Sequence, residues 1–148
     1  MKLHLAPAKP RDATALACIL ADWIDETPWM PDIHTPNEDR DFLTYLIRET
    51  EVIMPRTLLG PQGFMARDGA EIHALYLVPG VRGQGIGKRL LDQAKSKSPE
   101  LTLWTFQANL PARRFYAREG FREVRQTNGA GNDEKLPDVR LAWQRDTA

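Results

Sequence analysis

The segment from residue 82 to residue 87 combines residue types that bind anions. It reads Arg82-Gly83-Gln84-Gly85-Ile86-Gly87 and is followed by Lys88. Glycines lack the Cβ that would keep an anion from the backbone N–H groups, and the Arg and Lys side chains add positive charge. A helix that begins here offers N–H groups without intrahelical acceptors and the positive end of its dipole. The segment therefore predicts a phosphate-binding loop.

The glycine spacing excludes two familiar kinds of phosphate site. The dinucleotide fingerprint Gly-x-Gly-x-x-Gly is not matched. Gly87-Lys88 is followed by Arg89, whereas the loop that binds nucleoside triphosphates has Ser or Thr there. Glycines between a strand and a helix also occur for structural reasons alone. The neighbouring segments must therefore decide which anion is bound.

The elements around the loop alternate between strand and helix. A strand is expected over 71–78, ended by Pro79, and a helix over about 86–98 with Leu90 and Leu91 on its apolar face. A second strand is expected over 101–106. A second helix, capped by Asn109, should then end at Gly120.

Two of these segments resemble the GCN5-related N-acetyltransferase (GNAT) family. Leu77-Val78-Pro79 followed by the loop at 82–87 is similar to the family's Arg/Gln-x-x-Gly-x-Gly/Ala motif at the end of a strand. Residues 109–121 resemble a second family segment, Asn-x-x-Ala-x-x-x-Tyr-x-x-x-Gly-Phe. The resemblance extends over 71–124, and the first fifty residues carry no family motif.

The resemblance implies an acetyl-CoA dependent N-acetyltransferase that transfers the acetyl group directly to an amine through a tetrahedral intermediate. It implies an α/β (α+β) fold, with a mixed central sheet of six or seven strands, about four flanking helices and splayed central strands. We expect one domain over 1–148, with acceptor-side helices at roughly 10–50 and the acyl-CoA-binding core at roughly 70–125. A catalytically inactive module that binds acyl-CoA for regulation is the alternative.

The resemblance also assigns residues to the donor substrate. Leu77 and Val78 should pair with the pantetheine arm through their backbone, like an added strand, and their N–H groups could polarise the thioester carbonyl. Asn109 either contacts the same arm or only caps its helix. The expected acetyl-CoA contacts are Leu77, Val78, Arg82, Gly83, Gln84, Gly85, Ile86, Gly87, Lys88, Asn109, Ala112 and Tyr116.

Three residues are candidates for proton transfer. Tyr116 matches the family tyrosine that protonates the leaving thiolate, and its alternative is a core aromatic. A phenol of pKa about 10 can serve a thiolate of pKa about 8.5 when a cleft positions it. The amine must lose a proton, and the family often places a base on the strand at 71–78. Period-2 alternation puts Glu71 and His73 on one face with Leu75 and Leu77. Solvated side chains, or a water chain as the base, are the alternatives.

The first fifty residues predict two helices and a loop. Leu16, Ile19 and Leu20 form an apolar stripe after Asp12, and Thr35 with Glu38 forms a capping box for a second helix. The loop between them contains Trp29, Asp32 and His34. The family tends to wall its acceptor site with this loop, and an aromatic ring with acidic neighbours suits a cationic amine. The alternative is that Trp29 only ties the loop to the core.

Composition limits the partners. Twenty Lys and Arg balance twenty Asp and Glu, so we expect no general attraction to nucleic acid or to anionic membranes. The N-terminus lacks a signal-peptide core and no run approaches the ~20 apolar residues of a membrane span, which predicts a cytoplasmic protein. One cysteine excludes a cysteine-based metal cluster, and no metal is expected. Small amines, amino acids, antibiotics, protein N-termini and lysines remain open as acceptors, and so does a homodimer.

Overall fold

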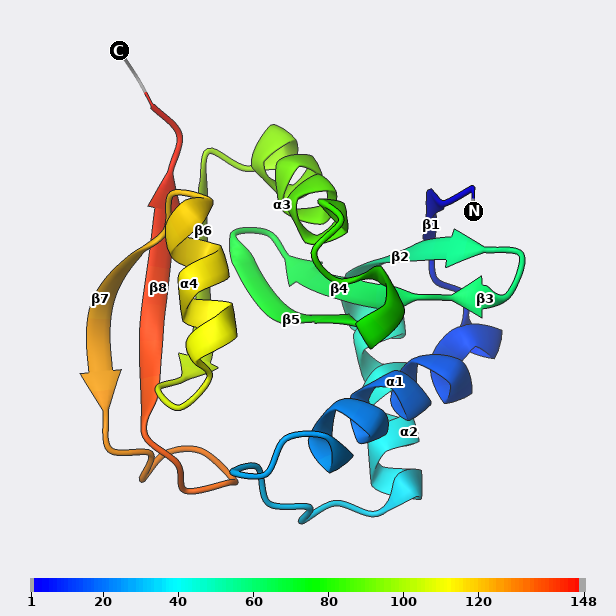
Figure 1. The fold of residues 1–148 in the computed structure, drawn as a ribbon, viewed down its shortest axis with the longest axis horizontal. Helices are drawn as coiled ribbons and strands as arrows, with labels where there is room; N and C mark the ends of the chain where they lie inside the picture. Colours follow the sequence, from blue (N-terminus) through cyan, green and yellow to red (C-terminus); the bar gives the residue numbers. More distant parts are fainter. Residues whose placement is uncertain (1, 147–148) are drawn as a thin grey trace.

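A computed structural model describes residues 2–146 and contains one mixed sheet flanked by helices (Figure 1). The eight strands run in the order β1-β2-β4-β5-β6-β8-β7, with β3 paired to β2. The strands are β1 (His4–Pro7), β2 (Glu51–Thr57), β3 (Gly60–Pro61), β4 (Gly63–Asp68), β5 (Glu71–Leu77), β6 (Glu100–Phe106), β7 (Arg122–Thr127) and β8 (Asp138–Gln144). The helices are α1 (Ala13–Asp25), α2 (Pro36–Glu49), α3 (Ile86–Lys97) and α4 (Leu110–Arg118). The predicted fold class is confirmed, and the two-residue β3 raises the number of strands to eight.

The sheet consists of two antiparallel halves that meet only briefly. The first half is β1-β2-β4-β5 and the second is β6-β8-β7. The parallel pair β5–β6 joins them at two positions, Glu71 opposite Thr102 and Ile72 opposite Leu103. Beyond Ile72 the two strands separate (Figure 1). The predicted splay of the central strands is therefore confirmed.

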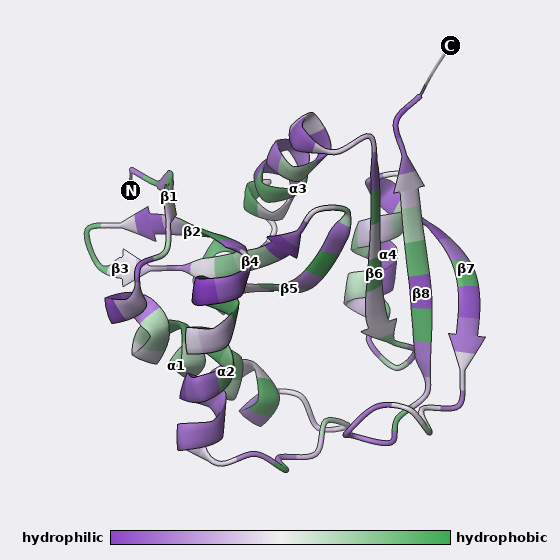
Figure 2. Ribbon diagram, turned by 180° about the vertical axis from the view of Figure 1, so that it is seen from behind, coloured by the Kyte–Doolittle hydropathy of each residue, from purple (hydrophilic) through white to green (hydrophobic). Residues whose placement is uncertain are grey.

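The helices cover the sheet unequally. Helices α1 and α2 pack on one face of the first half, in a core that contains Leu16, Leu43 and Phe64. Leu90 of α3 and Tyr116 of α4 belong to a second core, on the other face. Figure 2 shows the back of β6, β8 and β7 with no helix over it in the described part of the chain. Apolar and polar bands alternate along β8 there, as expected for a strand buried on one side.

The helix starts follow the local chemistry, with one exception. Thr35 accepts from the N–H of Glu38 at 3.1 Å, while the Glu38 carboxylate accepts from the N–H of Thr35 at 3.0 Å, so the predicted capping box is present. Asp12 precedes α1 but makes no side-chain cap. Its carboxylate instead accepts from the N–H of Lys9 and pairs with Arg56. No helix within residues 2–146 is long and apolar enough to cross a membrane.

Strand β2 continues through Pro55, although proline is rare inside a sheet. Pro55 has no N–H to give to the ladder. Its carbonyl accepts from the N–H of Gln62 at 2.7 Å, at the irregular point between β3 and β4. The missing donor therefore falls where the neighbouring pairing is already interrupted.

A bulge in β5 changes which side chains share a face. The register with β4 runs from Ala66 opposite Ala74 to Arg67 opposite Ile72, which leaves His73 as an extra residue. Consequently Ile72 belongs to the same core as Leu75, and Ala74 belongs to the other core. The prediction that Glu71 and His73 share a face with Leu75 and Leu77 is wrong, because it assumed unbroken alternation.

Candidate active site

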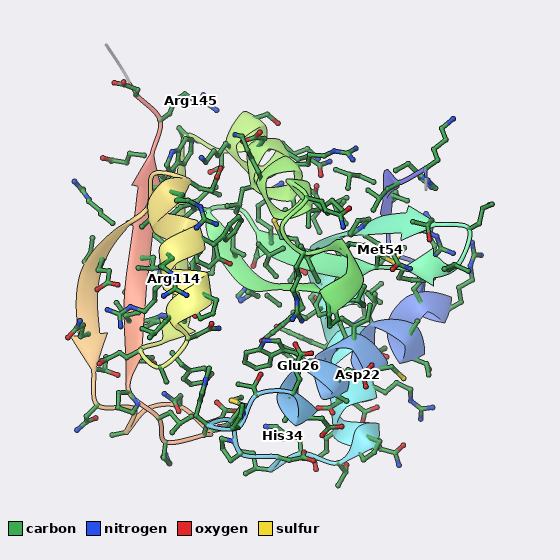
Figure 3. All side chains as sticks on the ribbon, in the orientation of Figure 1. Asp22, Glu26, His34, Met54, Arg114 and Arg145 are labelled. Carbon is green, nitrogen blue, oxygen red and sulfur yellow. The ribbon has the colours of Figure 1, made fainter. Side chains whose placement is uncertain are left out.

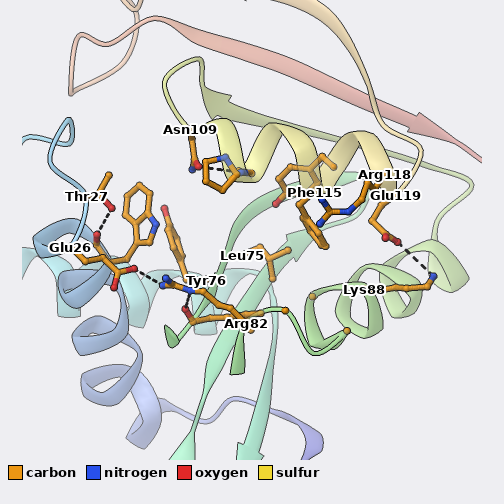
Figure 4. A pocket seen from close by; sticks show the side chains of 18 of the residues that line it. Glu26, Thr27, Leu75, Tyr76, Arg82, Lys88, Asn109, Phe115, Arg118 and Glu119 are labelled. Carbon is orange, nitrogen blue, oxygen red and sulfur yellow. Dashed lines mark hydrogen bonds and ion pairs between the residues drawn. The ribbon is translucent and has the colours of Figure 1, made fainter. Parts of the chain in front are cut away.

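A cleft of about 830 Å³ opens where β5 and β6 separate (Figure 4). Four segments form its walls: the end of α1 with the loop that follows, the second half of β5, the glycine-rich loop with the start of α3, and α4. This volume is typical of a pocket for a small molecule. The cleft therefore lies beside the part of β5 that does not pair with β6.

The glycine-rich loop fits a diphosphate group. Gly83 and Gly85 have φ values of +73° and +81°, which favour glycine, and Gly85 is the N-cap of α3. A Cβ at either position would meet no atom within 4 Å. The first helical bond runs from the N–H of Arg89 to the carbonyl of Gly85 at 3.1 Å, so the N–H groups just before it lack intrahelical acceptors. Open space beside such groups suits an anion.

Gly87 has a different reason to be glycine. A Cβ there would approach the Phe115 ring to 2.9 Å, closer than ordinary contact. The start of α3 can therefore lie against α4 only without a side chain at this position. This close approach holds the glycine-rich loop beside α4, where the second predicted segment lies.

Replacing Gly85 with Ala should weaken acetyl-CoA binding about tenfold. The substitution strains a left-handed residue by about 1–2 kcal/mol and puts a methyl group into the space left for the diphosphate. Isothermal titration calorimetry measures the change in Kd. Gly80→Ala is the matched control, because Gly80 lies in the same segment with open space around it and no positive φ. Equal Kd values for the two variants would contradict the role of the loop.

The other side chains of the loop divide into two groups. Arg82 and Lys88 line the cleft, whereas Gln84 bonds back to the carbonyl of Gly80 and Ile86 is buried in the core. Lys88 lies 3.2 Å from Asp92, and this hydrogen bond raises the pKa of the lysine above its ordinary value. The amide NH₂ of Gln84 is thus already bonded within the loop, and Ile86 can contribute only backbone groups.

The backbone groups of β5 that face the gap are those of Leu75 and Leu77. Successive residues of an antiparallel strand direct their N–H and C=O groups to alternate sides. The N–H of Val78 donates to the carbonyl of Gln62 at 2.9 Å, toward β4. The groups of Leu77 and Leu75 consequently point away from β4. The prediction for Val78 needs correction, because its N–H is already bonded within the protein.

Two tyrosines face the cleft from opposite walls. Tyr116 of α4 is only 6% exposed and packs against Phe115 and Phe121, with ring centroids 5.1 and 5.3 Å away. Burial raises the pKa of Tyr116 well above its ordinary value, with a smaller contribution from Tyr76. Burial, with a smaller contribution from Glu134, raises the pKa of Tyr76 to about 12. Both phenols stay protonated at neutral pH and can donate.

Asn109 has both of its predicted roles available. Its Oδ1 accepts from the N–H of Ala112 at 3.2 Å and so caps α4. Asn109 and Ala112 also line the cleft (Figure 4). Because the cap uses the oxygen of the amide, the NH₂ group is the part that a ligand would meet.

Comparison with known proteins identifies the family. The model of the Acetyltransferase (GNAT) family matches residues 12–121. The chain belongs to the GNAT family. It is 44% identical over 62 residues to the peptidyl-lysine N-acetyltransferase YjaB of Salmonella typhimurium, covering 42% of this chain and 43% of that protein. It is 29% identical over 135 residues to the peptidyl-lysine N-acetyltransferase YiaC of Escherichia coli, covering 86% and 90%.

The fold of this GNAT enzyme is similar to solved structures of the family. The solution structure of apo YjaB from Escherichia coli superposes with a TM-score of 0.81 at 25% identity, covering 99% of this chain and 100% of that one. The alignment with the first relative spans less than half of that protein. The chain thus belongs to a family of N-acetyltransferases, and its own activity and acceptor are matters for proposal.

Glu71 and His73 lie outside the cleft of this GNAT enzyme. The two Glu71 oxygens each accept from Arg140 at 2.7 Å, and one also accepts from the Thr102 hydroxyl at 2.9 Å. His73 is exposed at the bulge. Glu71 thus ties β5 to β6 and β8 at the point where the two halves of the sheet meet. The structure does not bring either predicted base to the donor loop or to Tyr116.

The wall of the cleft formed by the end of α1 and the loop after it is aromatic. Trp29 lines the cleft and contacts Trp23 and Phe106, with both centroid distances 5.9 Å. Trp23 also contacts Tyr76 at 5.1 Å. The sequence predicts Trp29 at this site but gives no sign that Trp23 lies there. It gives no sign of Tyr76 either, because both Trp23 and Tyr76 look like ordinary core residues in a periodic pattern.

The loop between β7 and β8 was also missed. Asn132 donates to the Leu136 carbonyl and to Asp138, and its Oδ1 accepts from the Leu136 N–H. Lys135 takes a φ of +56°, which is unusual for a non-glycine residue. This ordered loop carries Glu134, whose side chain is only 16% exposed and lies 3.8 Å from His34. A carboxylate thus lies beside the loop that follows α1.

Proposed function

We propose that this enzyme transfers the acetyl group of acetyl-CoA to a lysine side-chain amine of a protein. The observation that carries the proposal is the cleft itself, which has a glycine-rich loop with open space at one end and an aromatic wall with Glu26 at the other. The names of two relatives, both peptidyl-lysine N-acetyltransferases, support this acceptor class. Donor and acceptor would meet between β5 and α4.

The donor end of the cleft would bind acetyl-CoA in three places. The N–H groups of Gly83, Gly85 and the start of α3 would bind the diphosphate. The outward backbone groups of Leu75 and the N–H of Leu77 would pair with the pantetheine arm, as a strand added in the gap. One of these N–H groups would then polarise the thioester carbonyl.

The acceptor ammonium would lose two protons in the reaction, one before attack and one after it, and one proton would end on sulfur. The amine nitrogen attacks the thioester carbonyl carbon, the carbon–sulfur bond breaks, and the sulfur leaves with the bonding electron pair. Tyr116 would donate its phenolic proton to this thiolate, and the second proton lost by the nitrogen would restore the phenol. The first proton of the acceptor ammonium would leave through water at the acceptor end, because Glu71 and His73 lie outside the cleft.

The acceptor end favours a cation on a long apolar arm. The rings of Trp23, Trp29 and Tyr76 can pack along methylene groups and attract an ammonium through their faces. Glu26 lines the cleft there, and Glu134 acts on the phenol of Tyr76. A lysine side chain combines both features.

The direct test is acetyl-CoA-dependent thiol release across a panel of acceptors. We expect a lysine-containing peptide with a blocked N-terminus to support release, and mass spectrometry to show one acetyl group on the lysine. The same peptide with norleucine in place of lysine is the control. Calorimetric binding of acetyl-CoA without thiol release on any amine would favour the inactive regulatory module instead. Release only with free N-termini would replace lysine as the acceptor.

A further inference from the structure

Arg82 of the donor loop is bonded to a carboxylate of the acceptor wall. Its Nη2 lies 2.6 Å from Oε1 of Glu26, and its Nε donates to the carbonyl of Leu77 at 2.8 Å. Glu26 caps the end of α1, beside Trp23 and Thr27 (Figure 4). Both charged side chains line the cleft and are partly exposed. The pair therefore joins the two ends of the site directly.

The negative charge of Glu26 opposes the expected donor. A diphosphate on the glycine loop would lie beside Arg82 and would compete with Glu26 for its guanidinium. If Arg82 stayed with Glu26, a carboxylate would remain close to the diphosphate at a cost in Coulomb energy. Binding of the donor should therefore weaken the contact between Arg82 and Glu26.

A carboxylate released in this way would face the acceptor end. Glu26 is followed by Thr27, Pro28 and Trp29, all of which line the cleft, and Thr27 is fixed by a 2.6 Å hydrogen bond to the Trp23 carbonyl. Figure 4 shows Lys88, Arg118 and Glu119 at the far end of the cleft. An ammonium approaching the aromatic wall would thus meet Glu26 first among the carboxylates that line the cleft.

We propose that Glu26 binds the ammonium group of the acceptor, and that Arg82 holds this carboxylate until the diphosphate of the donor has bound. The acceptor half of this inference rests on the proposed function. The donor half does not, because it concerns only acetyl-CoA and the ligand-free protein. The acceptor site would be completed by the donor, so acetyl-CoA would bind first.

The test compares Glu26→Gln with wild type in two measurements. Calorimetry at low salt should show acetyl-CoA binding about threefold more tightly, because the competing charge is gone, and this gain should shrink in 0.5 M salt. Steady-state transfer to a lysine-containing peptide should show a KM about tenfold higher with kcat within about twofold. Asp22→Asn is the matched control: Asp22 lies one turn earlier on α1, is exposed and does not line the cleft (Figure 3).

Each measurement can overturn its own half of the proposal. An unchanged acetyl-CoA Kd in Glu26→Gln overturns the competition for Arg82. An unchanged peptide KM, or an equal rise in Asp22→Asn, overturns the ammonium role. If the wild-type enzyme acetylates no amine, the proposed function fails and the acceptor half fails with it, while the Kd comparison still decides the donor half.

Discussion

Replacing Tyr116 with Phe should lower kcat by about 10²–10⁴-fold, the range typical of losing a general acid. The substitution removes one hydroxyl from a ring that is 6% exposed and packed against Phe115 and Phe121, so the cleft keeps its shape. The Kd for acetyl-CoA should change by less than about twofold. Steady-state kinetics with a lysine peptide and calorimetry with acetyl-CoA measure the two quantities separately.

The pH dependence sharpens this test. Because burial raises the pKa of Tyr116 above its ordinary value, the phenol keeps its proton through the range in which a free tyrosine would lose it. The wild-type rate should therefore show no alkaline decline near pH 10 from this group. Tyr45→Phe is the control, since Tyr45 is half exposed on α2. Unchanged turnover in Tyr116→Phe would remove its role as the acid.

The conformation of the glycine-rich loop and the start of α4 could be predicted from sequence because their determinants are local. Gly83 and Gly85 are needed for their own φ values, and the capping role of Asn109 depends on a residue three positions away. The sequence at 82–87 and beside it therefore already contains the residues that set the conformation of the loop. Gly87 is the exception within the motif, because its requirement comes from Phe115 on another helix.

The bulge in β5 could not be predicted in the same way. Nothing in the residues 71–77 marks His73 as an extra residue, since the register with β4 is set by the packing of both strands. One inserted residue turns every preceding side chain to the other face. Period-2 reasoning consequently placed Glu71 beside Leu75, and the structure places it against Arg140 instead.

The other end of the cleft depends on contacts between distant segments. Glu26 meets Arg82 across 56 residues, and His34 approaches Glu134 across one hundred. The residues next to each of them in the sequence give no sign of these contacts. Only the folded chain shows that the loop after α1 and the loop after β7 lie side by side (Figures 1 and 2).

Replacing Glu71 with Gln should destabilise the fold by about 2 kcal/mol and leave the chemistry of the folded enzyme intact. The Glu71 and Arg140 side chains are 29% and 23% exposed, so the cost should lie between that of a surface pair and that of a buried one. The parallel ladder between β5 and β6 has only two register pairs, and Glu71 bridges it through Thr102 and Arg140. Thermal unfolding should show Tm lowered by about 4–8 °C.

A double-mutant cycle measures how much the ion pair between Glu71 and Arg140 stabilises the fold, and kinetics then tests whether Glu71 also acts as a base. Glu71→Gln and Arg140→Met should each lower the free energy of unfolding. The double variant should lose less than the sum of the two, because each single variant already removes the ion pair between these side chains. Glu100→Gln, at an exposed position of β6, should be neutral. Since a clamp acts on folding, kcat and its pH profile should match wild type at temperatures where the variant is folded. A lost acidic limb in that profile with an unchanged Tm would instead make Glu71 the base.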